Sequence, residues 1–88
     1  MNRVEKVTEA LSEFDASIRG RQWWPGAPAN KDQYAADRAA LNKIRKQIVR
    51  NDYESAKALL GVLPQALLPL VPKSVRFLIK YEFKKTGA

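Results

Sequence analysis

Two runs of basic residues are the part of this sequence best suited to binding. Between residues 30 and 51 there are six lysines and arginines against two carboxylates, and between residues 73 and 88 there are five against one. Cationic side chains replace the counterions of phosphate groups, so runs of this kind favour nucleic acid as the partner. The residues expected to contact it are Arg38, Arg45, Lys46, Arg50, Lys73, Arg76, Lys80 and Lys84.

The second run also contains aromatic residues. Phe77 and Tyr81 each follow one residue behind a cation, Arg76 or Lys80, so on a helix the rings lie beside the charged row. Such rings can stack on unpaired bases. A basic helix face can also serve solubility alone, but Glu82 is the one acidic residue after position 54. Because so few carboxylates can neutralise the row, we expect a polyanion-binding surface with little base specificity.

The segment 19–29, Arg-Gly-Arg-Gln-Trp-Trp-Pro-Gly-Ala-Pro-Ala, is a second candidate site. Large aromatics and arginines are the residues that most often anchor protein interfaces. Arg19, Arg21, Trp23 and Trp24 therefore predict, as the alternative, a regulator or inhibitor that docks on an acidic protein surface. A chain this short has little core material, so we also expect one or both indole rings to fold back and cap the bundle.

Catalytic residues are scarce. The chain has no cysteine and no histidine, which removes thiolate nucleophiles, disulfides, the commonest general base and the usual zinc ligands. It has no phosphate-binding glycine loop and no nucleophile motif, and Glu9 and Glu13 fall on the polar side of the first expected helix. We expect a non-catalytic binding protein without a cofactor, metal or small-molecule substrate. Its expected role is that of an accessory factor that binds nucleic acid or a nucleoprotein machine.

One carboxylate falls inside an apolar stripe. Asp37 lies near Tyr34 and Leu41 on the face of a predicted helix that should be buried, and a buried carboxylate needs a hydrogen-bond partner. We expect that partner to be a tryptophan indole, a tyrosine hydroxyl or an arginine of the 19–29 segment. The role of Asp37 would then be structural.

Apolar residues recur at helical spacing through most of the chain, as in Val4, Val7, Leu11, Phe14 and Ile18. No run of β-branched residues has the period of a strand, so we predict an all-α, single-domain bundle of four to five helices. A long loop rich in Trp, Pro and Gly joins the first two. The expected helices cover 3–18, 31–50, 53–61 and 74–84, with a short turn at 65–68, and Asn30 and Asp52 are expected N-caps.

Nothing in the sequence predicts a membrane span or a secretion signal. The stretch 59–71 is apolar but is broken by Pro64 and Pro69 and is much shorter than the roughly 20 residues that cross a bilayer. We expect a cytoplasmic protein. A lesser alternative is a membrane surface, into which Leu67, Leu68, Leu70 and Val71 insert while Lys73, Arg76 and Lys80 meet anionic headgroups. It is disfavoured because the loss of those apolar side chains would deplete the core. The narrow apolar seam of the first helix also leaves a homodimer open.

Overall fold

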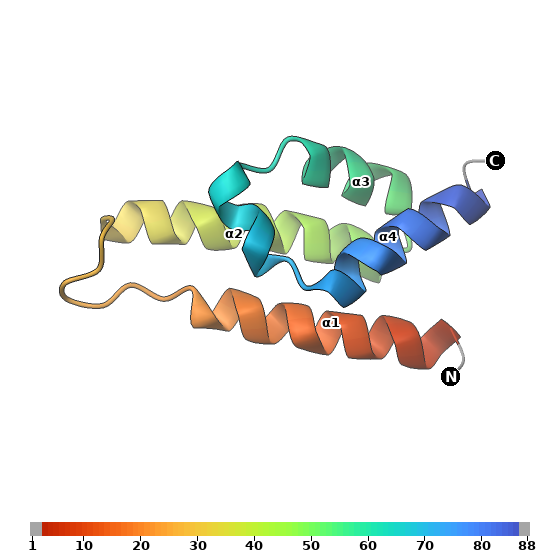
Figure 1. Ribbon diagram of the computed structural model, residues 1–88, viewed down its shortest axis with the longest axis horizontal. Coiled ribbons are helices and arrows are strands. Elements are labelled where there is room, and N and C mark those ends of the chain that lie inside the picture. The colour runs from red at the N-terminus through yellow and green to blue at the C-terminus, as the bar shows by residue number, and fades with distance from the viewer. Residues whose placement is uncertain (1–2, 87–88) are drawn as a thin grey trace.

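The computed structural model describes residues 3–86, and the side chains of residues 4–82. These residues form helices and no strand, so the predicted all-helical class is confirmed, and five helices fit the expected bundle roughly. The helices are α1 (Arg3–Gly20), α2 (Lys31–Val49), α3 (Tyr53–Gly61), the 3-10 helix η1 (Gln65–Leu70) and α4 (Lys73–Thr86) (Figure 1).

Two helix starts are fixed by side-chain caps that the sequence predicted. The Asn30 side chain accepts a hydrogen bond from the Gln33 backbone N–H at 2.8 Å, and the Asp52 side chain accepts one from the Ser55 backbone N–H at 3.1 Å. Each bond satisfies a donor that the first turn of a helix leaves unpaired. Between α2 and α3 the chain turns at Asn51, whose φ of 60° is left-handed, a conformation that asparagine tolerates better than most residues.

α1 and α2 run antiparallel, and residues 21–30 join them (Figure 1). α1 and α3 each pack against both α2 and α4. α2 and α4 therefore lie across the core from one another. Their outward faces point to different sides of the molecule, which decides how the two basic runs are presented.

The core is built from all five helices. Its fully buried large side chains are Phe14, Tyr34, Leu41, Ile44, Ile48, Tyr53, Val71, Val75 and Ile79. In α1 the expected seam is displaced at its start: Val4 is 72% exposed, and Ala10 is buried instead. Phe14 and Ile18 of that seam pack inside the chain's own core.

The expected start of the last helix at Ser74 was wrong by one residue. α4 begins at Lys73, and the Pro72 carbonyl accepts the first hydrogen bonds, from the backbone N–H groups of Val75 and Arg76. The Ser74 hydroxyl instead donates to the Glu13 carboxylate of α1. A local capping preference thus yields here to a contact between helices.

The proline-broken stretch fills the core from one side. Leu67 and Val71 are buried, and Leu68 and Leu70 are half-buried against the same cluster. These side chains are therefore engaged inside the protein's own core. Within the described residues, no helix combines the length and apolar character needed to cross a bilayer.

Candidate functional site

Two of the four cations predicted as binding residues on α2 are engaged within the bundle. Arg45 forms an ion pair with Asp15 of α1, with 3.3 Å between its Nη2 and the Asp15 Oδ2. The Arg38 guanidinium donates to the backbone carbonyl of Arg21 at 2.8 Å. Lys46 and Arg50 are exposed. The α2 run therefore offers fewer available cations than its composition indicates.

The α4 run is presented differently. Lys73, Arg76 and Lys80 are all exposed, and none of the three has an ion-pair or hydrogen-bond partner among the side chains that the structure describes. Their spacing of three and four residues puts them in one row on the outer face. Lys84 continues this row in the sequence, but its side chain lies outside the described residues.

The two predicted basic runs do not form one surface. Since α2 and α4 lie across the core from each other, Lys46 and Arg50 face a different side of the molecule from the α4 row. A ligand held by one row cannot use the other without wrapping around the bundle. The α2 side also keeps three exposed cations at the same spacing, Lys43, Lys46 and Arg50. The α4 row differs from it in the exposed rings of Phe77 and Tyr81 beside it, and not in the number of its available cations.

Beside the α4 row, α1 and α4 enclose an open groove of about 750 Å³. Two exposed rings of α4 contribute to it: Phe77 is 70% exposed and Tyr81 is 47% exposed. The Lys6 ammonium of α1 lies 5.8 Å from the centre of the Tyr81 ring. The full lining is Lys6, Glu9, Lys73, Ser74, Phe77, Leu78, Tyr81 and Glu82.

Sequence reasoning found the α4 half of this groove and missed the α1 half. Phe77 and Tyr81 were expected beside the cations because they follow them by one residue. Lys6 and Glu9 join them only because α1 packs alongside α4. No spacing within α1 indicates that neighbour, so the missing signal is a tertiary contact and not a motif.

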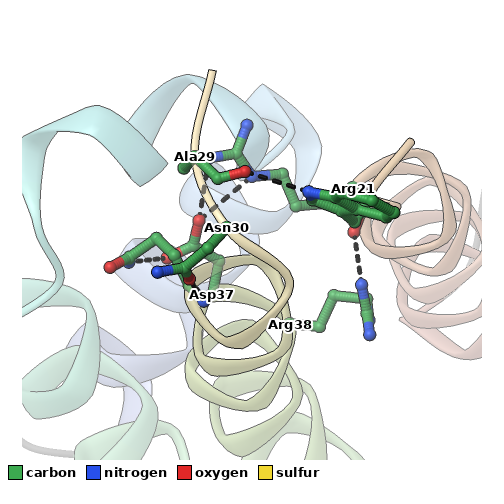
Figure 2. A network of polar contacts seen from close by, with 7 residues as sticks. Arg21, Ala29, Asn30, Asp37 and Arg38 are labelled. Atoms are coloured by element: carbon green, nitrogen blue, oxygen red, sulfur yellow. Dashed lines mark hydrogen bonds and ion pairs between the residues drawn. The ribbon is translucent and has the colours of Figure 1, made fainter. Parts of the chain in front are cut away.

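In the 21–30 connection, the expected arginine partner of Asp37 is confirmed (Figure 2). Arg21 donates to the Asp37 Oδ2 from Nε at 3.1 Å and from Nη2 at 2.8 Å. Gln33 donates to the other carboxylate oxygen at 2.9 Å, and the guanidinium carbon of Arg21 lies 4.3 Å from the centre of the Tyr34 ring. Arg21 is thus held in place as a structural contact, whereas Arg19 is exposed at the end of α1.

Neither tryptophan ring is buried in the core, although Trp24 lies against the buried Tyr34, as the expected capping of the bundle requires. Trp23 is 37% exposed and Trp24 is 53% exposed. The Trp23 indole N–H donates to the Ala29 carbonyl at 3.1 Å, and the Trp24 ring meets the edge of Tyr34 at 6.0 Å between centres. Trp24 and the Arg21 guanidinium thus lie against the ring of Tyr34, which is itself buried.

Comparisons with protein-family models, with curated proteins and with solved structures found no match to this chain. Among the described residues, no group of three or more carboxylate, histidine or cysteine side chains could hold a metal ion. The function has to be inferred from the surfaces described above, of which the α4 row with its groove and the tryptophan connection are the two candidates.

Proposed function

We propose that this protein is a non-catalytic nucleic-acid-binding protein, and that the outer face of α4 is its main contact surface. The observation that carries the proposal is the row Lys73, Arg76 and Lys80, which is exposed, has no carboxylate partner among the described residues, and runs beside two exposed aromatic rings. Cations bind phosphates by displacing counterions, and neighbouring rings add stacking.

Solubility alone explains this surface poorly. Charges that serve only solubility can lie anywhere on the outside. Here Phe77 and Tyr81 are exposed between the cations and α1, and an exposed aromatic patch bordered by polar residues is typical of an interaction site. The combination favours a ligand with both negative charge and flat rings.

The test is an anisotropy titration with fluorescein-labelled DNA and RNA, single-stranded and duplex, at several salt concentrations. Three phosphate contacts predict a slope of log K against log salt of about −2 on single strands, at about 0.7 for each contact. The double variant Arg76→Gln with Lys80→Gln removes two of these contacts. By the same relation between log K and log salt, its binding should be about 25-fold weaker at 0.1 M salt.

The matched control is Lys46→Gln with Arg50→Gln, which removes the same charge from the α2 side. We expect the affinity of this variant for the oligonucleotides to be within about threefold of that of the unaltered protein. Charges far from the α4 face contribute little, because salt at 0.1 M screens them over roughly 10 Å. No binding at low salt would contradict the proposal. Equal losses for the two double variants would show that binding follows net charge and not the α4 face.

A second candidate function is supported by a different observation, the exposure of both tryptophans in the 21–30 connection. The exposed indoles, with the Lys31 ammonium 5.4 Å from the centre of the Trp23 ring, suit docking on an acidic protein surface. In that case Trp23→Ala with Trp24→Ala should abolish partner binding at unchanged helicity and leave oligonucleotide binding intact. A homodimer through α1 stays a prediction, and sedimentation velocity would test it.

A further inference from the structure

The groove between α1 and α4 contains a carboxylate that the cationic row does not explain. Glu9 is exposed, lines the groove, and has no ion-pair or hydrogen-bond partner among the described residues. A carboxylate repels phosphate and accepts hydrogen bonds from amino groups. A ligand that fits both features must keep its phosphates on the outer row and direct hydrogen-bond donors toward Glu9.

The groove and the row run side by side along α4. Phe77 and Tyr81 are four residues apart, which separates them by about 6 Å along the helix axis. The cations from Lys73 to Lys80 span seven residues, or about 10 Å, which is longer than one phosphate group reaches. The cavity of about 750 Å³ is within the range of about 300 to 1,000 Å³ that is usual for small-ligand pockets. The length of the cationic row favours a chain of nucleotides over a single one, and the cavity has room for the bases.

From this arrangement we infer that the groove binds unpaired bases of a single-stranded nucleic acid, and selects bases that carry an exocyclic amino group. A base stacks on Phe77 or Tyr81, its phosphates contact the α4 row, and its amino group donates to Glu9. Cytosine offers such a donor to a carboxylate and thymine does not. A duplex is disfavoured because its bases are already stacked and paired. This inference rests on the proposed function and adds the form of nucleic acid and its base preference.

The first experiment uses the unaltered protein at neutral pH and moderate salt. Labelled dodecamers of deoxycytidine and of deoxythymidine have the same length and phosphate charge, so they differ only in the bases that the groove contacts. We expect the deoxycytidine strand to bind at least about fivefold tighter than the deoxythymidine strand. We also expect it to bind at least about fivefold tighter than a mixed-sequence duplex of equal length, since stacking on each ring is worth about that factor or more.

Variants then assign the effect to the groove. Glu9→Gln should reduce the preference for deoxycytidine to less than about twofold, whereas Asp32→Asn, which removes an exposed carboxylate from α2, should leave that preference unchanged. Phe77→Ala should weaken single-strand binding about fivefold or more and leave duplex binding unchanged. Trp24→Ala, which removes an exposed ring outside the groove, should change neither.

The outcomes separate this inference from the proposed function. Equal binding of deoxycytidine, deoxythymidine and duplex, with Arg76→Gln and Lys80→Gln still weakening all three, would overturn the groove inference and leave the phosphate-binding face intact. Binding of none of them at low salt would overturn both. Deoxycytidine monophosphate that displaces the dodecamer at an equal concentration would overturn the assignment to a strand.

Discussion

The contact between Arg21 and Asp37 predicts a large effect from one substitution. Asp37 is 5% exposed, and Arg21→Ala would leave its carboxylate with the hydrogen bond from the Gln33 side chain. A hydrogen bond to a buried charged group contributes about 1.5 to 3 kcal/mol. The Arg21 side chain is 29% exposed, so solvent screens part of this, and we expect a loss of about 2 kcal/mol in the free energy of unfolding.

That loss is a sizeable part of the total, because domains of this kind are stable by about 5 to 15 kcal/mol. For a chain of this length it corresponds to a fall in Tm of about 10 °C. Urea and thermal unfolding followed by far-UV circular dichroism would measure both quantities. The matched control is Arg19→Ala, because the Arg19 side chain is exposed and forms no ion pair or hydrogen bond among the described residues. Its substitution should change stability by less than about 0.5 kcal/mol.

A double-mutant cycle assigns the energy to the pair. Arg21→Ala and Asp37→Ala together should cost at least about 0.5 kcal/mol less than the sum of the two single substitutions, since residues in contact are coupled. If Arg21→Ala were no more destabilising than Arg19→Ala, or if the cycle were additive, the view of Arg21 as a structural contact would be refuted. Arg21 would then be available to the tryptophan site.

Three further predictions follow from the fold. Phe14→Ala removes a fully buried ring and should cost about 3 to 5 kcal/mol, whereas Phe77→Ala, with a ring that is 70% exposed, should unfold at nearly the unaltered urea midpoint. Asn30→Ala should lower stability by about 1 kcal/mol and Asn30→Gly by only a few tenths; equal effects would contradict the capping bond. Hydrogen bonds from Ser55 lower the pKa of Asp52, so its ionised form stabilises the fold above the unfolded pKa of about 3.9 and this contribution is lost as pH falls through the lower folded value. The stability difference between Asp52→Asn and the unaltered protein should therefore shrink below about pH 4 in a pH series of urea titrations, and a constant difference would argue against the bond.

Features set by neighbouring residues were predictable from the sequence. Asn30 and Asp52 cap the helices that follow them because a capping bond joins a side chain to a backbone group three residues on, and no tertiary contact has to be known. The arginine partner of Asp37 was predictable for a related reason. Its place in an apolar stripe required a partner, and the adjoining segment supplied two arginines.

Features that depend on which helices meet were not predictable. Val4 follows the same spacing as Phe14, yet it is exposed and Ala10 is buried, because the start of α1 extends beyond the bulk of the core. Ser74 has the chemistry of an N-cap but bonds to Glu13 of another helix. In both cases the local preference is worth about 1 kcal/mol or less, which a packing contact can outweigh.

The same reasoning explains why the two basic runs differ in the contacts of their cations. By composition the two basic runs are alike, since each carries a surplus of four positive charges. Asp15 of α1 faces α2 and forms an ion pair with Arg45, and the Arg21 carbonyl accepts a hydrogen bond from Arg38. Two cations of α2 are therefore engaged in contacts within the bundle. On the side of α1 that faces α4, Glu13 takes the hydroxyl of Ser74 and Glu9 is left unpaired, so none of the three described cations on α4 is neutralised. The positive surplus thus remains available beside the groove, where a ligand with phosphates on one edge and amino groups on the other would match both the cations and Glu9.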